Sequence, residues 1–404
     1  MRLGLKPRKE RLSARIRVAM VCALVSLVSG CMGDGGSMSM GLFDSKPQTA
    51  ARSVTMFVAS TRRDDRRIGD AVGDSGAHHA MVMVSVPPGH QPGVIEAPTF
   101  GKPNAKSHFA LTNARAMTPE AFTSELGSHI SGRVGADRDI LLYVHGFNTS
   151  LDEARLRLTQ IAVDARFGGV PVLFTWPSES GLLSYVSAKE RATASRDALQ
   201  GLIRDLAAVP GVGRVHVLAH SMGSWLAMEA LRENAIAGHP DLDGKLGDVM
   251  LAAPDIDLGV FRQQMARLGA AARVSIFVSR DDRALSLSSR LAGDRPRVGA
   301  MDPRNTQDAA DLRKLGVRVY DLSGISNGFI GHGAYADAPA VIRSIGAQLA
   351  EPRKEDSTSV AVIDARGAGP EGQMIGGAQA APQPPQAQPL PPMEDDAKRA
   401  GGLR

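Results

Sequence analysis

The chain has 404 residues, of which 43% are hydrophobic, 22% charged and 4% aromatic, a composition typical of a globular protein and unlike a coiled coil or a collagen. Its net charge of +5 would fit a nucleic-acid-binding protein, but residues 1–30 alone hold seven Lys and Arg residues against one Glu. Because the rest of the chain is close to neutral and has no overall basic field, we expect no nucleic-acid partner.

The N-terminal segment has the features of a secretory signal. Its basic stretch is followed by an apolar run, 18–28, which is too short to cross a hydrocarbon core of ~30 Å but suits the apolar region of a signal peptide. The run ends in Val-Ser-Gly-Cys at Cys31, which resembles the lipobox of bacterial lipoproteins. The resemblance implies a signal peptide over 1–30 and a lipid on Cys31. The alternative is an ordinary signal peptide followed by an incidental cysteine.

The positions of the two cysteines and the identity of the residue after Cys31 indicate where in the cell the protein is located. The other cysteine, Cys22, lies in the segment that cleavage would remove, so the mature chain would have no thiol for a disulfide, a metal site or a nucleophile. Met32 follows Cys31, and the lack of Asp there resembles lipoproteins that are sorted to the outer membrane. We therefore expect a lipid-anchored protein in a bacterial cell envelope, at the periplasmic face of the outer membrane.

Composition divides the mature chain into a folded body and two extended ends. Residues 31–51 are rich in Gly, Ser and Met, which indicates a flexible tether behind the lipid anchor. Residues 351–404 hold no aromatic residue and include a Pro/Gln/Ala tract, so a disordered tail with polyproline II character is expected there. The remaining segment, 52–350, has the size of one large α/β domain.

Within 52–350, short apolar runs alternate with longer amphipathic segments. The predicted strands are 54–59, 81–86, 139–144, 170–175, 215–219, 248–252, 274–278 and 317–321, and the predicted helices are 151–167, 188–209, 222–234 and 338–349. Several of the strand runs are continuously apolar, which is typical of strands that are covered on both faces. The pattern predicts a mostly parallel, doubly wound α/β sheet flanked by helices, with the active site at the C-terminal ends of the strands.

A candidate nucleophile lies directly after the predicted strand 215–219. Ser221 stands between this strand and an apolar helix, with Ala219 two residues before it and Gly223 two residues after it. A nucleophile elbow needs small residues at these two positions, because the strand and helix backbones crowd the strained turn. The alternative is a serine that only caps the helix N-terminus.

A serine nucleophile needs a histidine as base and a carboxylate that orients the histidine, in the chain order Ser, acid, His. His332 is the only one of the ten histidines that follows a plausible acid; His220 adjoins the serine and is expected to pack beside the elbow. The candidate acids after the strand 274–278 are Asp281 and Asp282, and Asp282 is favoured because the Arg-Ala-Leu after it resembles the turn after the acid in such folds.

Two further carboxylates remain as alternative acids. Asp255 and Asp257 follow the strand 248–252, although an Asx turn that starts a helix before Phe261 is the favoured explanation of this motif. Acyl transfer also needs donors for the oxyanion, and the backbone N–H groups of Met222 and Phe147 are the candidates. His145 is expected to support the loop that carries Phe147.

Together these segments resemble the α/β-hydrolase superfamily and, within it, a bacterial family of esterase/lipase-like proteins called the domain of unknown function 900. The resemblance covers about 54–349 and depends on Tyr-Val-His-Gly-Phe-Asn at 143–148, Phe-Thr-Trp-Pro-Ser at 174–178, Ala-His-Ser-Met-Gly at 219–223, Ala-Pro-Asp-Ile-Asp at 253–257, Ser-Arg-Asp-Asp-Arg-Ala-Leu at 279–285 and Gly-His at 331–332. It implies the hydrolase fold and a Ser221, Asp282, His332 triad, but no substrate. A segment at 58–62 also resembles the family, and its Arg62 is expected either to face the site or to form a surface salt bridge.

We therefore expect a serine hydrolase that cleaves carboxylic ester, thioester or lipid acyl bonds through an acyl-enzyme, with no metal and no cofactor. An acyltransferase that uses the same triad is the nearest alternative. In a different class of function, the chain would be a non-catalytic, lipid-anchored envelope binding or scaffold protein whose Pro-rich tail makes the contact. The expected partners are an ester or acyl-lipid substrate and, through the N-terminal lipid, a membrane.

Overall fold

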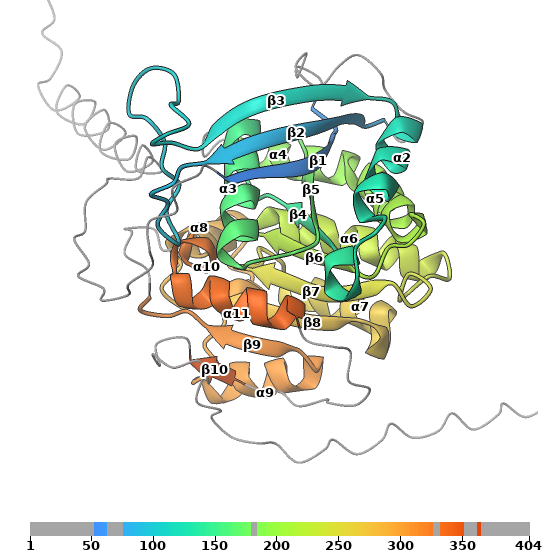
Figure 1. Ribbon diagram of the computed structural model, residues 1–404. Helices are drawn as coiled ribbons and strands as arrows, with labels where there is room; N and C mark the ends of the chain where they lie inside the picture. The colour runs from blue at the N-terminus through green and yellow to red at the C-terminus, as the bar shows by residue number, and fades with distance from the viewer. Residues whose placement is uncertain (1–51, 63–75, 179–183, 326–331, 351–361, 365–404) are drawn as a thin grey trace, which may run out of the picture.

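The computed structural model describes residues 52–62, 76–178, 184–325, 332–350 and 362–364 (Figure 1). The predicted signal peptide over 1–30 and the predicted anchor and tether over 31–51 lie outside the described residues. Of the predicted tail, 351–404, only 362–364 is described. No helix in the described ranges is long and apolar enough to span a bilayer.

Ten strands in the described part of the chain form one twisted sheet (Figure 1). They are β1 (Arg52–Ser60), β2 (His78–Val86), β3 (Ala110–Met117), β4 (Ile140–Val144), β5 (Val170–Thr175), β6 (Val215–His220), β7 (Leu246–Ala252), β8 (Arg273–Val278), β9 (Arg318–Asp321) and β10 (Val362–Asp364). Their order across the sheet is β10-β9-β8-β7-β6-β4-β5-β1-β2-β3. Only the β1–β2 and β2–β3 pairs are antiparallel; every other pair is parallel.

The predicted fold class is confirmed, and all eight predicted strands are present. The pattern did not reveal β3, because this edge strand exposes six of its eight residues and so lacks an apolar run. It also did not reveal β10, a three-residue strand that pairs with β9 inside the segment for which a disordered tail is expected.

Helices cover both faces of the sheet (Figure 1). They are α2 (Pro119–Ile130), α3 (Leu151–Asp164), α4 (Tyr185–Ala194), α5 (Arg196–Ala208), α6 (Met222–Ile236), α7 (Leu258–Leu268), α8 (Arg283–Leu291), α9 (Thr306–Leu315), α10 (Ala334–Asp337) and α11 (Pro339–Ala350). The single helix predicted over 188–209 is instead two helices, α4 and α5. They meet at the buried Ser195, whose hydroxyl donates to Arg191 O at 2.9 Å and also contacts Thr61 Oγ1 at 2.8 Å.

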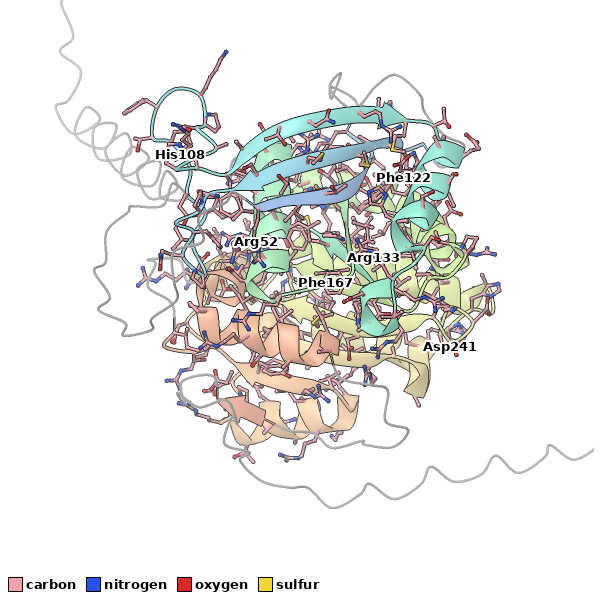
Figure 2. The ribbon with its side chains drawn as sticks, viewed as in Figure 1. Arg52, His108, Phe122, Arg133, Phe167 and Asp241 are labelled. Atoms are coloured by element: carbon pink, nitrogen blue, oxygen red, sulfur yellow. The ribbon has the colours of Figure 1, made fainter. Side chains whose placement is uncertain are left out.

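The apolar core has two layers, one on each face of the sheet. Residues of α3 and α11 belong to one layer, and residues of α2, α5 and α6 belong to the other. In β4, Leu141 points into the first layer and Leu142 into the second, which explains why the strand is apolar throughout. In the second layer Phe122 of α2, labelled in Figure 2, packs edge-on against Phe57 of β1 with ring centroids 5.3 Å apart. These layers hold the C-terminal ends of β4, β6, β7 and β8 in fixed relative positions.

Candidate active site

Ser221 occupies a strained turn between β6 and α6. Its backbone has φ 53° and ψ −124°, a region that L-residues with a side chain rarely adopt, at a cost of about 1–3 kcal/mol. Two neighbours hold the turn: Ser221 N–H donates to Ala252 O at 2.9 Å, and Asp255 N–H donates to Ser221 O at 3.2 Å. The side chain is 5% exposed. A serine kept in a strained conformation at a strand-to-helix junction has the geometry of a nucleophile elbow.

Two glycines allow other backbone segments to approach this turn closely. A Cβ on Gly223 would collide with the carbonyl oxygens of Val144 and His145, so no larger residue fits where α6 crosses the end of β4. A Cβ on Gly146 would lie 2.9 Å from Ser221 Cβ. The loop after β4, which carries Phe147, therefore lies directly against Ser221.

Asp282 and His332 are brought together from 50 residues apart. Asp282 Oδ2 lies 2.6 Å from His332 Nδ1, and Asp282 Oδ1 accepts from Leu285 N–H at 3.0 Å as the N-cap of α8. Asp282 is 1% exposed. Burial alone would lower the pKa of His332, but the adjacent Asp282 carboxylate outweighs it and raises this pKa above the usual 6.5. The carboxylate thus orients the imidazole and stabilises its charged form.

His220 links this pair to the elbow. Its Nε2 lies 3.1 Å from His332 O, and its ring stacks on Tyr335 at a centroid distance of 4.7 Å. The rings of His220 and His332 are 4.6 Å apart. His332 is therefore a close neighbour of the residue before Ser221, while the described contacts include no hydrogen bond between Ser221 Oγ and His332. His220 packs beside the elbow, as expected.

The two predicted oxyanion donors lie at the edge of the same site. Met222 is the first residue of α6, so its N–H has no acceptor within the helix. Phe147 lies in the loop that touches Ser221 through Gly146, and its ring contacts Tyr185 at 5.8 Å. No acceptor in the described part of the chain pairs with the Phe147 N–H.

The three alternative acids have other partners. The Asp281 side chain is about half exposed and accepts from Gly324 N–H at 3.0 Å. Asp257 caps α7 by accepting from Val260 N–H at 3.1 Å, so the helix start expected before Phe261 is present. The structure thus pairs only Asp282, of the four candidates, with His332 by a hydrogen bond among the described residues.

Asp255 belongs to a buried polar cluster that the sequence did not reveal. Its carboxylate accepts from Tyr185 Oη at 2.7 Å and from Ser288 Oγ at 2.5 Å, and Arg297 Nε lies 3.2 Å from it. Tyr185 also contacts Phe147, so the cluster adjoins the loop of the site. These residues lie in four separate segments, and no spacing in the sequence links them.

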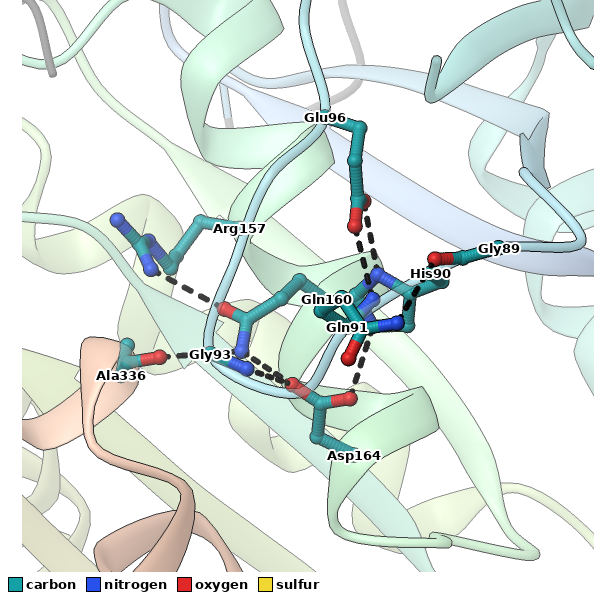
Figure 3. Close-up of polar contacts among 9 residues, drawn as sticks. All are labelled: Gly89, His90, Gln91, Gly93, Glu96, Arg157, Gln160, Asp164 and Ala336. Carbon is teal, nitrogen blue, oxygen red and sulfur yellow. Dashed lines mark hydrogen bonds and ion pairs between the residues drawn. The ribbon is translucent and has the colours of Figure 1, made fainter. Parts of the chain in front are cut away.

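A second cluster without a sequence signal holds α10, the helix that begins two residues after His332 (Figure 3). His90 lies 2.8 Å from Glu96 and 2.9 Å from Asp164. Gln160 Nε2 donates to Asp164 Oδ2 at 2.6 Å and to the α10 carbonyl of Ala336 at 3.0 Å. Burial alone would lower the pKa of His90, but its bonds to Asp164 and Glu96 raise it to about 9. A charged histidine therefore ties the loop after β2 to α3, which in turn holds α10.

Metal ligands do not gather at this site or elsewhere in the described ranges, where no three His, Cys, Asp or Glu side chains lie close enough to hold an ion. The arrangement is compatible with proton transfer at His332 and nucleophilic attack by Ser221.

Comparisons with known proteins identify a family. The family model described as "Alpha/beta hydrolase of unknown function (DUF900)" matches residues 118–353, more than half of the chain. No curated protein matches the sequence.

Several solved structures align with the chain at low similarity. Carboxyl esterase 2 from the mycorrhizal fungus Tuber melanosporum is 13% identical, with 81% of this chain and 96% of that chain covered and a TM-score of 0.38. An esterase from Pyrobaculum calidifontis is 13% identical, with 87% and 95% covered and a TM-score of 0.34. Brefeldin A esterase, a bacterial homologue of human hormone sensitive lipase, is 15% identical, with 78% and 80% covered and a TM-score of 0.37. The chain is therefore assigned to a family on the basis of the family model and not of these alignments.

Proposed function

The chain belongs to the DUF900 family of alpha/beta hydrolases, and on that premise we propose that it is a serine hydrolase that cleaves carboxylic ester, thioester or lipid acyl bonds through an acyl-enzyme on Ser221. The observation that carries the proposal is the strained Ser221 turn beside a hydrogen-bonded Asp282–His332 pair. A structural serine at a helix N-cap needs neither the positive φ nor a neighbouring carboxylate–imidazole pair.

In the first half of the reaction, Ser221 Oγ attacks the carbonyl carbon of the substrate while its proton passes to His332 Nε2. The bond to the leaving alcohol or thiol then breaks, and His332 returns the proton to that leaving group. Asp282 keeps the other ring nitrogen, Nδ1, engaged at 2.6 Å, so that Nε2 is the nitrogen that can take and give the proton. The product of this half is an ester between the acyl group and Ser221.

In the second half, water attacks the acyl-enzyme, His332 accepts a proton from the water, and Ser221 Oγ leaves with that proton as the free acid departs. Each attack places negative charge on the carbonyl oxygen. The N–H groups of Met222 and Phe147 are the donors proposed for this oxyanion, and such a donor contributes about 10²-fold or more in kcat.

We also propose that the enzyme works while attached to a membrane by a lipid on Cys31, at the periplasmic face of the outer membrane. The support is the basic and apolar leader that ends in Val-Ser-Gly-Cys. Metabolic labelling with an alkyne palmitate in a bacterial host should label the wild-type chain and not Cys31→Ser. Equal labelling of both would contradict the anchor.

The experiment that tests the hydrolase treats the purified protein with a fluorophosphonate probe and with p-nitrophenyl acetate, butyrate and palmitate. Ser224→Ala is the matched control for Ser221→Ala, because Ser224 lies one turn further along α6 and its hydroxyl donates to Ala219 O at 2.9 Å. The proposal predicts labelling and turnover in the wild type and the control, and neither in Ser221→Ala. Wild-type protein that neither takes the probe nor turns over any ester would refute it.

A further inference from the structure

The fully buried His145, in the loop after β4, has hydrogen-bond partners at both ring nitrogens. On one side, Nδ1 lies 2.9 Å from the carbonyl oxygen of Gly146. On the other side, Nε2 lies 2.9 Å from Thr175 Oγ1, 3.2 Å from Trp176 N and 3.3 Å from an Arg62 terminal nitrogen. The ring also stacks on Trp176, with 7° between the planes.

These partners determine where the single proton of the neutral ring lies. A carbonyl oxygen can only accept, so Nδ1 must carry the proton. The Trp176 N–H and the guanidinium of Arg62 can only donate, so Nε2 must be the bare nitrogen, and the Thr175 hydroxyl then donates to it as well. The opposite tautomer would set an N–H against two other donors and leave Gly146 O without its donor.

The proton on Nδ1 has a consequence for the next peptide group. Among the described residues no peptide bond is cis, so the Gly146 carbonyl and the Phe147 N–H point in opposite directions. Because the carbonyl is held by the His145 ring, the Phe147 N–H is turned away from that ring. The same turn lies against Ser221, since a Cβ on Gly146 would be 2.9 Å from Ser221 Cβ.

Arg62 is the charged member of this arrangement. It follows the end of β1, and its Nε donates to Thr175 Oγ1 at 2.7 Å while a terminal nitrogen donates to Thr149 O at 2.7 Å. One guanidinium thus joins the end of β5 to both ends of the loop from His145 to Thr149. Arginine suits this position because its rigid, planar guanidinium can donate to several acceptors at once, whereas the lysine ammonium is a single point charge.

We propose that Arg62 is a positioning residue for the oxyanion hole: it holds His145 in the Nδ1–H form and thereby aims the Phe147 N–H at the reacting carbonyl oxygen. The inference rests on the serine hydrolase function proposed above and adds to it a residue outside the triad. Arg62 acts through His145 and Gly146 and touches no substrate atom in this account.

The protonation state of His145 agrees with this role. Burial and then the positive charge of Arg62 lower the pKa of His145 to about 3. The ring therefore stays neutral throughout the pH range in which an esterase works, and only the choice between its two tautomers remains to be controlled.

The tautomer can be measured without any enzymatic activity. Protein labelled with ¹⁵N-histidine gives ring nitrogen shifts that distinguish a protonated from a bare nitrogen, and the His145 signals are identified by their loss in His145→Gln. The wild type should show a single Nδ1–H form. In Arg62→Met the Thr175 hydroxyl no longer accepts from Arg62 and can accept from Nε2–H instead, so a minor Nε2–H population should appear although the Trp176 N–H remains. Wild-type protein protonated on Nε2, or an Arg62→Met spectrum identical to that of the wild type, would overturn the inference.

Kinetics test the consequence for catalysis, with rates normalised to the Ser221 titrated by a fluorophosphonate so that misfolded protein does not count. For Arg62→Met we expect kcat to fall about 10²-fold with little change in KM, as when an oxyanion donor is lost. The affinity for an alkyl boronic acid, which forms the tetrahedral adduct, should fall by the same factor. Arg62→Lys keeps the charge but not the fork, and should lose nearly as much.

Arg133→Met is the matched control. Arg133, labelled in Figure 2, is an arginine away from the site that donates to three backbone carbonyls, those of His129, Asp137 and Gly168. It should keep wild-type kcat. Unchanged kcat and boronic acid affinity in Arg62→Met would refute the role of Arg62 but would not affect the proposed hydrolase function. A wild type that shows the Nδ1–H form but never reacts with the probe would refute the hydrolase instead, and with it any role of Arg62 in catalysis.

Discussion

The two ends of the parallel strands each hold a histidine beside an aspartate, but only one of these histidines keeps a nitrogen available for chemistry. At the C-terminal ends, His332 pairs with Asp282 through Nδ1, and its Nε2 has no partner among the described residues. At the N-terminal ends, His216 lies 3.2 Å from Asp139 through Nε2 and accepts from Asp248 N–H at 2.9 Å through Nδ1.

The difference shows why a histidine–carboxylate pair alone does not identify a base. In His216 both nitrogens have partners, and Gly247 packs so closely on the ring that a Cβ there would lie 2.6 Å from Nδ1. Such a histidine can only stabilise the fold. His332 lies beside a strained serine and has one nitrogen occupied, which is the arrangement that a general base requires. Four predictions separate the two ends, and a fifth concerns the His90 cluster.

The largest expected effect is on catalysis at the C-terminal end. His332→Ala removes the proposed base, so kcat per mole of folded protein should fall about 10⁴-fold or more. His216→Ala should leave kcat per titrated Ser221 unchanged. Initial rates with p-nitrophenyl butyrate measure both, and a His332→Ala enzyme with near wild-type kcat would break the distinction between the two histidines.

The next effect concerns the acid. Asp282→Asn removes the charge that orients His332 and should lower kcat at neutral pH about 10⁴-fold. Asp281→Asn is the adjacent control and should be close to wild type, because the Asp281 side chain is half exposed and faces Gly324. Should Asp281→Asn be the more damaged enzyme, the assignment of the acid would be wrong.

The pH profile tests the same pair. His332 must be neutral to accept a proton, so kcat/KM should rise with pH through the pKa of His332, with a midpoint above 6.5 because Asp282 raises this pKa. In Asp282→Asn only the weaker effect of the Asp255 charge still opposes that of burial, and the midpoint should move to lower pH. A midpoint that is the same in both enzymes would show that another group titrates.

Sequence patterns predicted the parts of the fold and site that depend on local order. The buried strands and the turn around Ser221 are continuous stretches whose residue types follow from burial on both faces and from crowding at a tight turn. The position of His332 could be predicted from chain order alone. The contacts of Arg62 with His145 and of Asp255 with Tyr185 could not, because they join segments 83 and 70 residues apart through tertiary packing.

At the N-terminal end the expected effect is on stability. His216→Ala leaves the buried Asp139 without one of its donors and opens a cavity, so the free energy of unfolding should fall by about 3 kcal/mol. Chemical denaturation followed by circular dichroism measures this change. If His332→Ala destabilised the protein more than His216→Ala, the structural role of the N-terminal end would be contradicted.

The smallest predicted effect is the pH dependence of the His90 cluster (Figure 3). The pKa of His90 rises from 6.5 in the unfolded chain to about 9 in the fold, so its contribution is fully present below pH 6.5 and is lost as pH rises through about 9. At about 1.4 kcal/mol per pKa unit the shift amounts to about 3 kcal/mol, which solvent screening of this partly exposed group reduces to on the order of 2 kcal/mol. The stability difference between wild type and His90→Gln should therefore shrink between pH 6.5 and 9.5, and a difference that stays constant over this range would contradict the charged state of His90.

The most direct test of the central claim is the mass of the intermediate. The protein is mixed with p-nitrophenyl butyrate, quenched in acid within the pre-steady state, digested and analysed by mass spectrometry. A butyryl group is expected on the peptide that contains Ser221, and no such adduct is expected on that peptide from Ser221→Ala. Turnover with no adduct on that peptide, or an adduct on another residue, would contradict a mechanism centred on Ser221.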